Sequence, residues 1–353
     1  MNHVQCGVAL SGYTTLGLGG PASRFVVAGT DDELVSQVRA ADERGEPLLV
    51  LGGGSNLVIS DDGFDGTVVR VATRGVVVAG DRRTLTVAAG EDWDSLVRRC
   101  VTAGLAGLEC LSGIPGLTGA TPIQNVGAYG QEVAETIIAV RTYDRLRREM
   151  AELTAPQCGF GYRTSMFKRD PGRHVVLGVT FGLARERLSR PVGYAELATR
   201  LGVTAGDRVP LEDARSAVLG LRRGKGMVLD PGDPDTRSAG SFFTNPVITK
   251  EQFAGVERVA SGLFGDEIRV PWYPAHDGLV KVPAAWLIER AGFGKGYQSG
   301  DARISSKHTL ALVNPGGGST KGLLGLAAEI RDGVLAAFGV RLTPEPVLVG
   351  VTL

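Results

Sequence analysis

Three polar side chains lie in stretches rich in glycine, aromatic residues or proline, where they could take part in chemistry. Arg163 ends a Gly-Tyr-Arg run, and its guanidinium is a rigid fork that suits a carboxylate or a phosphate. Ser241 stands between a glycine and two phenylalanines, and Glu345 stands between two prolines. The commoner explanations are a solvated arginine, a serine that caps a turn and an exposed carboxylate. No Gly-x-Ser-x-Gly elbow is present, so serine-hydrolase chemistry is poorly supported.

Two glycine-rich stretches are candidate binding loops. Gly52-Gly53-Gly54-Ser55-Asn56 follows an apolar run, and its unshielded backbone N–H groups suit phosphate oxygens, although a tight turn between strands explains it equally well. Residues 113–130 are rich in turn-forming residues and are either an Ω-loop packed on itself or a cradle for a planar or phosphorylated cofactor. The presence of two such loops in one domain favours a bound cofactor over simple turns. Neither loop is a Walker A motif or a Rossmann fingerprint.

Length and charge narrow the class of protein. At 353 residues, the chain is expected to form about two domains. The 38 Lys and Arg balance the 38 Asp and Glu, which excludes a global electrostatic grip on nucleic acid or on an anionic membrane. With 43% hydrophobic and 22% charged residues, the composition is that of a globular protein.

Cysteine and histidine usage predicts a reduced, cytoplasmic setting without a metal site. The four cysteines include no Cys-x-x-Cys pair, and the four histidines include no His-Glu-x-x-His motif. No apolar run approaches the roughly 20 residues of a membrane span. Residues 1–5 lack the basic start of a signal peptide, so neither secretion nor membrane insertion is expected.

Hydrophobic periodicity and capping signals predict an α+β domain over about residues 20–185. Thr30 and Glu33 form a capping box before a helix that ends at Gly45, and a second helix is expected over residues 92–101. Strands are expected at residues 48–51, 67–71, 76–79, 84–88, 136–143 and 174–181.

A polar, mostly helical stretch over residues 185–235 is interpreted as a connector. A second domain is expected to begin near Ser238. Its helices are expected at residues 250–261, 283–290 and 320–338, with strands at 309–313 and 340–351.

Taken together, these segments resemble the UDP-N-acetylenolpyruvoylglucosamine reductases, also called UDP-N-acetylmuramate dehydrogenases, which are flavoenzymes of bacterial peptidoglycan synthesis. The matching segments follow the family's order over nearly the whole chain, and the ordered set is highly specific. They are Leu51-Gly52-Gly53-Gly54-Ser55-Asn56, Gly113-Ile114-Pro115-Gly116, Gln124-Asn125-Val126-Gly127-Ala128-Tyr129-Gly130, Gly161-Tyr162-Arg163-x-Ser165-x-Phe167-Lys168, Arg222-x-x-Lys225, Gly240-Ser241-Phe242-Phe243-x-Asn245-Pro246, Ala284-Ala285-Trp286-Leu287-Ile288 and Pro344-Glu345. One departure is Thr14-Thr15-Leu16, where the family commonly has Asn-Thr.

The resemblance implies an α+β fold with two domains. Residues 1–185 would form a FAD-binding domain of the vanillyl-alcohol-oxidase (PCMH) type, built of two α+β subdomains and joined by the C-terminal strand at 340–353. Residues 186–237 would be a connector with a candidate lid loop, and residues 238–339 a smaller α+β substrate-binding domain.

The resemblance also implies the cofactors, FAD with NADPH as co-substrate. The FAD pyrophosphate would rest on Gly52, Gly53, Gly54, Ser55 and Asn56. The flavin would be wrapped by Ile114, Pro115, Gly116, Gln124, Asn125, Gly127, Ala128 and Tyr129.

The implied reaction reduces UDP-N-acetylglucosamine enolpyruvate to UDP-N-acetylmuramate in two half-reactions. NADPH delivers a hydride to FAD, and reduced flavin then delivers hydride to the enolpyruvyl group. By the same resemblance Arg163, Ser241 and Glu345 are the catalytic residues. Arg163 would stabilise the developing anion, and Ser241 would donate a proton to the adjacent carbon. Glu345 would fit beside an anion if burial raised its pKa and kept it protonated.

Substrate contacts carry over in the same way. Lys225 and Asn245 match family positions near UDP, and Tyr162 and Gln298 complete the expected substrate set. Tyr194 resembles the lid tyrosine of the class with an extra loop and could close over the diphosphate; alternatively it is a helix residue of the connector. A monomer without a nucleic-acid partner is expected.

Two rival functions are kept. One is a different flavoenzyme of the same fold, such as a sugar oxidase that uses oxygen; the Ser241 and Glu345 motifs argue against it. The other is a non-enzymatic sugar-nucleotide binding protein, which replacement of Arg163, Ser241 or Glu345 would have supported. All three residues are present.

Overall fold

The computed structural model describes residues 4–353; residues 1–3, with His3 and the start of the predicted 1–185 domain, lie outside the described residues. The chain divides into two compact units, and each is discontinuous in sequence. Unit 1 holds the residues up to Val8, then Ala22–Gly54 and Phe64–Val228. Unit 2 holds Ala9–Pro21, Ser55–Gly63 and Leu229–Leu353. Two short N-terminal segments therefore belong with the C-terminal third of the chain.

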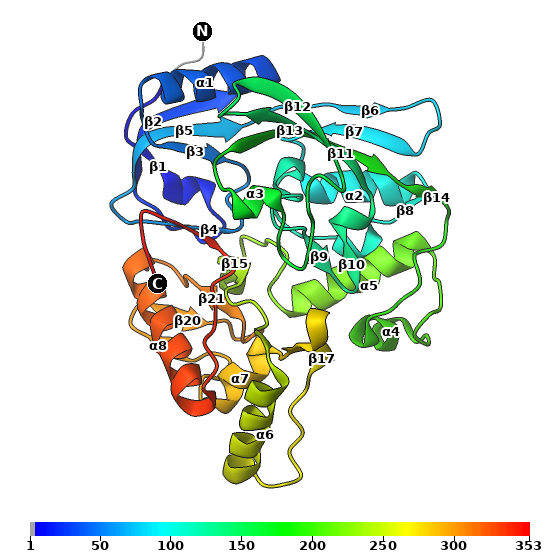
Figure 1. The fold of residues 1–353 in the computed structure, drawn as a ribbon, viewed down its shortest axis with the longest axis vertical. Coiled ribbons are helices and arrows are strands. Elements are labelled where there is room, and N and C mark those ends of the chain that lie inside the picture. Colours follow the sequence, from blue (N-terminus) through cyan, green and yellow to red (C-terminus); the bar gives the residue numbers. More distant parts are fainter. Residues whose placement is uncertain (1–3) are drawn as a thin grey trace. The chain divides into compact units, whose positions relative to one another are not determined.

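Unit 1 is built on two sheets (Figure 1). In the first, β2 (Pro21–Ala28), β5 (Phe64–Val71) and β3 (Leu48–Leu51) run parallel, with β1 (Val8–Ala9) next to β2. The second is antiparallel, in the order β12 (Glu149–Thr154), β11 (Ile137–Asp144), β13 (His174–Gly182), β7 (Thr84–Ala88) and β6 (Val76–Val78). One apolar core, which includes Trp93, Tyr143 and Phe181, serves both sheets.

The remaining elements of unit 1 are short or helical. The helices are α1 (Asp31–Glu43), α2 (Trp93–Thr102), α3 (Met166–Arg169), α4 (Ala195–Leu201) and α5 (Leu211–Gly224). Two small ladders pair β9 (Gly127–Ala128) with β10 (Gln131–Glu132), and β8 (Leu105–Ala106) with β14 (Ala184–Arg185). Single 3₁₀ turns lie at Glu109–Leu111, Thr118–Ala120 and Val133–Glu135.

The capping box and the closing glycine read from the sequence are confirmed, and the structure adds a cap at Asp92. The Thr30 hydroxyl accepts the Glu33 N–H at 3.2 Å, and the Glu33 carboxylate accepts the Thr30 N–H at 3.3 Å. Asp92 caps α2 by accepting the Ser95 N–H at 2.8 Å. Gly45, at φ +64°, follows the end of α1 in the left-handed conformation that favours glycine.

Unit 2 packs three helices against short strands. One sheet has the order β15 (Ser238–Ser241), β21 (Ala311–Val313), β20 (Ala302–Ile304) and β19 (Gln298–Ser299). A second joins β16 (Val247–Ile248), β18 (Val280–Lys281) and β17 (Tyr273–Pro274). The helices are α6 (Lys250–Phe264), α7 (Ala284–Arg290) and α8 (Thr320–Phe338), and α8, drawn in red, lies against β20 and β21 (Figure 1). Single 3₁₀ turns lie at Leu10–Tyr13, Pro234–Thr236 and His276–Gly278.

The N-terminal segments are tied into unit 2 by hydrogen bonds. The strand β4 (Leu57–Ile59) pairs in parallel with β22 (Val347–Val349), close to the end of the chain. The Asp61 carboxylate accepts the Thr320 N–H at 2.8 Å and the Lys321 N–H at 3.0 Å, so it satisfies the otherwise unpaired donors at the start of α8.

Two sequence expectations for unit 2 were too long. The strand expected over residues 340–351 is confined to Val347–Val349, because Pro344 and Pro346 have no N–H to donate to a ladder. The strand expected at 309–313 begins only at Ala311, because the chain is still turning at His308, whose C=O accepts the Ala311 N–H at 3.1 Å.

The stretch expected to be a connector, residues 186–237, carries α4 and α5, which pack on each other within unit 1. Unit 2 resumes at Leu229, ahead of the second domain expected from residue 238. Among the helices within residues 4–353, none has the length and apolar character needed to cross a membrane.

Candidate active site

Arg163 is built into the glycine-rich loop of unit 1. Its Nη2 donates to the Gly127 carbonyl at 2.7 Å, and its Nη1 lies 3.5 Å from the Asn125 carbonyl. Arg163 has φ +52°, a left-handed conformation that is uncommon for residues other than glycine. Such strain persists where the surrounding structure over-determines it and is commonest at functional sites. The arginine is therefore held in one place, unlike a freely solvated surface arginine.

Asn125 organises the same loop from inside. It is 1% exposed, and its side-chain nitrogen donates to the Gly161 carbonyl at 3.1 Å and to the Glu132 carboxylate at 2.7 Å. Its side-chain oxygen accepts the Ala134 N–H at 3.1 Å. These three bonds fix the side chain of Asn125 and hold the loop together.

The segment after Arg163 adds two more links to this loop. The buried Ser165 hydroxyl donates to the Ile123 carbonyl at 2.5 Å and caps α3 by accepting the N–H groups of Phe167 and Lys168. Lys168 Nζ lies 3.4 Å from the Gln124 side-chain oxygen. We call residues 123–132 and 161–168 the arginine-clamped loop.

The two glycine-rich stretches meet within unit 1. A Cβ added to Gly53 would lie 2.7 Å from the Cα of Gly116, closer than real Cβ atoms approach backbone. Glycine at position 53 is what allows this approach. The Trp93 N–H donates to the Gly116 carbonyl at 3.1 Å and fixes the second stretch to α2. The boundary between the units falls within the first stretch, after Gly54, so Ser55 and Asn56 belong to unit 2.

Three of the predicted binding residues gather near the start of α4. The rings of Tyr129 and Tyr194 meet edge to face at 5.4 Å, and Lys225 Nζ lies 5.8 Å from the Tyr129 ring centre. Lys225 also pairs with the Glu196 carboxylate at 2.5 Å. Burial raises the pKa of Tyr129 to about 12, so its phenol is neutral at physiological pH. Tyr194 immediately precedes α4 and is 42% exposed.

Arg222 is a buried cation to which sequence reasoning assigned no role, although its motif was noticed. Its Nη2 donates to the Met227 carbonyl at 2.8 Å, while its buried Nε has no hydrogen-bond partner among residues 4–353. Burial lowers the pKa of Arg222 to about 10, which leaves it charged at neutral pH. A Cβ on Gly113 would lie 3.5 Å from this Nε, so the donor faces the glycine-rich stretch. A buried donor of this kind needs an acceptor, which can be a ligand or an ordered water.

Ser241 and Glu345 are brought close together along the backbone of unit 2. The Glu345 N–H donates to the carbonyl of Phe242, the residue after Ser241, at 2.8 Å. Asn56 joins the same group, since its carbonyl accepts the Val347 N–H at 2.9 Å and its side-chain nitrogen lies 3.5 Å from the Glu345 carbonyl. Residues separated by almost 300 positions in sequence thus meet in one place.

Asn245 and Gln298 make local contacts. The Asn245 side-chain oxygen accepts the Ala284 N–H at 2.9 Å and so fixes the start of α7. Gln298 lies exposed in β19, and its side-chain nitrogen donates to the Gly300 carbonyl at 3.2 Å. Tyr162 is 41% exposed, and its ring centre lies 5.7 Å from the Arg163 guanidinium.

Comparison with known proteins first gives the class. Residues 22–145 match the family model described as "FAD binding domain", and residues 233–349 match "UDP-N-acetylenolpyruvoylglucosamine reductase, C-terminal domain". The first match defines a flavoprotein of the FAD-binding fold expected from the sequence.

Relatives along the full length then give the family. The chain is 57% identical to the UDP-N-acetylenolpyruvoylglucosamine reductase of Thermobifida fusca over 98% of both chains. It is 58% identical to that of Streptomyces coelicolor, over 98% of this chain and 90% of the relative. The crystal structure of the Thermus caldophilus reductase covers 99% of this chain and 100% of its own, with a TM-score of 0.68 at 27% identity. The chain belongs to the UDP-N-acetylenolpyruvoylglucosamine reductase family.

Proposed function

We propose that this chain reduces UDP-N-acetylglucosamine enolpyruvate to UDP-N-acetylmuramate with electrons from NADPH, and that Arg163, Ser241 and Glu345 carry the chemistry. The observation that supports this activity is a sequence identity of 57% and 58% to two reductases of the family, over 98% of this chain. The residue roles rest on the motif matches and on the contacts described above.

The two glycine-rich stretches fit an FAD molecule. The close approach of Gly53 to Gly116 leaves backbone rather than side chain at the glycine-rich stretches, and the unpartnered Nε of Arg222 is a buried donor for an acceptor that the protein does not supply. Gly52–Gly54 with Ser55 and Asn56 would hold the pyrophosphate, and residues 114–116 and 124–129 would hold the flavin. When bound there, FAD would supply the hydride-transfer chemistry that links NADPH to the enolpyruvyl group.

Ser241 is the proposed proton donor. Hydride addition to the terminal enol carbon leaves negative charge delocalised onto the substrate carboxylate, and the adjacent carbon must then receive a proton. Ser241 is the last residue of β15, and the carbonyl of the next residue, Phe242, accepts the Glu345 N–H at 2.8 Å. A positioned acid typically contributes about 10²–10⁴-fold to a rate. The serine proton would be replaced from solvent or through a relay after each turnover.

Arg163 and Glu345 are proposed to stabilise the charge that develops. A guanidinium stays charged at neutral pH, and a fixed cation acts most strongly in a site without water. The two hydrogen-bonded carbonyls, of Asn125 and Gly127, hold the Arg163 guanidinium in a fixed orientation. Glu345, matched to the family's glutamate near the terminus, is proposed to act with Arg163.

Lys225 and Tyr194 are proposed to receive the diphosphate of the substrate. Lys225 Nζ, 5.8 Å from the Tyr129 ring centre, offers a point charge to phosphate oxygens, and Tyr194, whose ring meets that of Tyr129, would close over the diphosphate as a lid. Asn245, Tyr162 and Gln298 are proposed as further substrate contacts. We also propose a monomeric, cytoplasmic enzyme, which fits the neutral net charge and the sparse cysteines.

A visible spectrum tests this function. Purified protein should be yellow, bleach with anaerobic NADPH, and regain its colour on addition of UDP-N-acetylglucosamine enolpyruvate. Recovery with oxygen at a comparable rate, but not with that substrate, would favour a sugar oxidase. A colourless protein that fails to bind added FAD would remove the flavin function altogether.

A further inference from the structure

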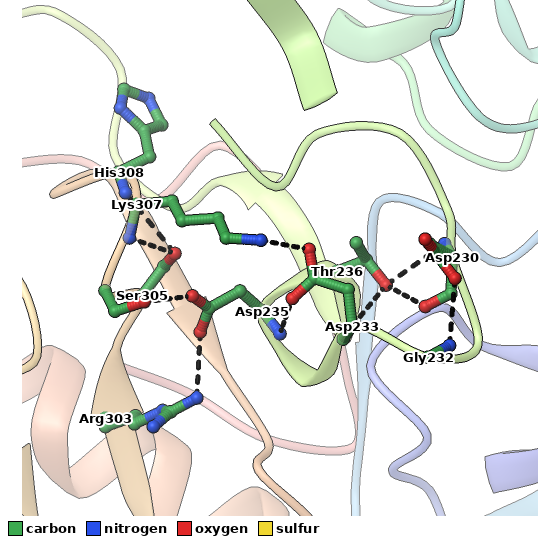
Figure 2. A network of polar contacts seen from close by, with 10 residues as sticks. Asp230, Gly232, Asp233, Asp235, Thr236, Arg303, Ser305, Lys307 and His308 are labelled. Carbon is green, nitrogen blue, oxygen red and sulfur yellow. Dashed lines mark hydrogen bonds and ion pairs between the residues drawn. The ribbon is translucent and has the colours of Figure 1, made fainter. Parts of the chain in front are cut away.

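A polar network joins the segment before Ser241 to the turn between β20 and β21 (Figure 2). Asp235 accepts a hydrogen bond from Arg303 Nη2 at 2.9 Å and one from the Ser306 hydroxyl at 2.5 Å. Two residues earlier, Asp233 pairs with Lys307 Nζ at 2.5 Å. The Thr236 hydroxyl lies within hydrogen-bond distance of the Asp230 and Asp233 carbonyls, at 2.9 and 2.8 Å. We call these residues the Asp235 network.

Asp235 is the buried member of the network. Its side chain is 3% exposed, against 21% for that of Asp233. A buried carboxylate is expensive unless its charge is paired and its lone pairs are hydrogen-bonded, and here Arg303 and Ser306 supply both. Removing Arg303 would leave the Asp235 carboxylate buried with its charge uncompensated, so the contact favours one geometry for the two segments.

The ion pair reaches across β21, the strand against which β15 and its residue Ser241 are aligned. Arg303 on β20 stands opposite Val313 on β21, and Val313 stands opposite Ser238 on β15. Asp235 precedes Ser238 by three residues, so its bond to Arg303 reaches across β21 and ties the start of β15 to β20.

β15 needs such a tie because its own ladder is sparse. It is the edge strand of its sheet, and it pairs with β21 only at Ser238 and Ser241, with an irregular register between them. Gly240, at φ +74°, lies within this irregular stretch. A slip of one residue would turn the side chain at position 241 to the opposite face of the sheet.

We propose that Asp235 is a positioning residue for the second half-reaction: its ion pair with Arg303 sets the register of β15 and thereby the direction in which Ser241 delivers its proton. This inference rests on the proposed role of Ser241. It assigns a catalytic consequence to a carboxylate that belongs to none of the predicted site residues.

The test separates the two half-reactions by stopped-flow absorbance. In Asp235→Asn, reduction of bound FAD by NADPH should keep its rate, while reoxidation by saturating enolpyruvyl substrate should slow by about 10- to 100-fold, the effect expected of a misplaced catalytic group. The control is Asp233→Asn, which breaks the more exposed ion pair of the same segment and should change reoxidation by less than about 3-fold. A purely structural Asp235 would lower the melting temperature and leave the reoxidation rate at 25 °C unchanged, which would overturn the inference.

A double-mutant cycle with Ser241→Ala identifies the route. If Asp235 acts through Ser241, adding Asp235→Asn to Ser241→Ala should slow reoxidation no further. Multiplicative losses would mean another route and would overturn the inference while leaving the role of Ser241 intact. If Ser241→Ala itself leaves reoxidation unchanged, the proposed function of Ser241 fails first, so the two failures are distinguishable.

A variant at the other end of the ion pair decides the matter if Asp235→Asn does not fold. Arg303→Gln removes the ion pair at its more exposed member, whose side chain is 27% exposed, and leaves the Ser306 hydrogen bond to Asp235 in place. A selective slowing of reoxidation by about 3-fold or more, with FAD reduction unchanged, would support the inference. Equal rates in Arg303→Gln and the parent enzyme would refute it.

Discussion

The arginine-clamped loop of unit 1 and the Asp235 network of unit 2 hold their predicted catalytic side chains in different ways. Arg163 is itself part of the scaffold, because its guanidinium donates to the Gly127 carbonyl of the loop it would serve. Ser241 is carried by a strand, and the charges that fix this strand belong to Asp235 and Arg303. A substitution at Arg163 should therefore disturb chemistry and scaffold together, whereas one at Ser241 should disturb chemistry alone.

The largest expected effect is at Ser241. Ser241→Ala should retain FAD and its reduction by NADPH, while reoxidation by the enolpyruvyl substrate falls by about 10²–10⁴-fold. Thr244→Ala, three residues further along the chain, is the matched control. Equal slowing of both half-reactions in single-turnover measurements would contradict the division of roles.

The next effect sharpens the contrast between the two regions. Arg163→Lys keeps a charge but loses the fork, so reoxidation should slow by about 10²-fold or more. FAD should also bind about 10-fold more weakly, because the loop loses hydrogen bonds from a charged donor. The control is Arg169→Lys. Arg169 lies on neighbouring α3 and donates to the Gly159 carbonyl, so this variant alters another arginine–carbonyl contact nearby. Unchanged FAD affinity, measured by flavin fluorescence, would show that the Arg163 hydrogen bonds are not needed to hold the loop in its FAD-binding shape.

A third prediction concerns the close approach of the glycine-rich stretches. Gly53→Ala places a Cβ 2.7 Å from the Cα of Gly116 and should lower the free energy of unfolding by about 1–3 kcal/mol. Gly52→Ala meets only Leu117 Cδ1 at 3.9 Å and should change stability little. Urea unfolding of the two apoproteins compares them directly, and equal midpoints would show that the stretches separate easily.

A smaller effect is expected at Lys225. Lys225→Ala should raise the KM for the enolpyruvyl substrate by about 10-fold with little change in kcat, because a uniform contact to the diphosphate is lost. Glu196→Gln breaks the same 2.5 Å ion pair but keeps the cation, and should leave KM within about 2-fold because partly exposed pairs contribute little. Steady-state kinetics at fixed NADPH separates the two variants.

The smallest effect is the pH dependence of the Asp233–Lys307 pair. The hydrogen bond from Lys307 lowers the pKa of Asp233 from its ordinary value of 3.8. A lowered folded-state pKa stabilises the fold above the ordinary pKa, and this stabilisation disappears as the pH falls through the folded-state value. The melting temperatures of Asp233→Asn and the parent should therefore differ at pH 6 and converge below pH 4. A difference in melting temperature that does not change with pH would show that packing, and not the charge of Asp233, causes it.

Local signals in the sequence predicted local structure well. The capping box of Thr30 and Glu33 and the helix over Thr320–Phe338 were confirmed, since both depend on interactions within one or two turns. The FAD-binding fold was also confirmed, but through ordered motifs rather than through periodicity.

Long-range partners could not be predicted in this way. Nothing local in Leu57–Ile59 specifies a parallel partner at Val347–Val349, and nothing around Asp235 reveals that it will be buried against Arg303. The unpartnered Nε of Arg222 was equally invisible, because its burial depends on how α5 packs on the rest of unit 1. The individual roles of Arg163, Ser241 and Glu345 stay predictions.

The pairing of β4 with β22 also constrains how the protein comes to fold. Unit 2 needs both Ser55–Gly63 and Val347–Val349, which are separated by almost 300 positions. A contact between such distant segments closes slowly, and a growing chain cannot form it before Val347–Val349 has been made. Unit 2 should therefore complete its fold late in synthesis, and its early segment Ser55–Gly63 must wait for its partner strand while most of the chain is still being made.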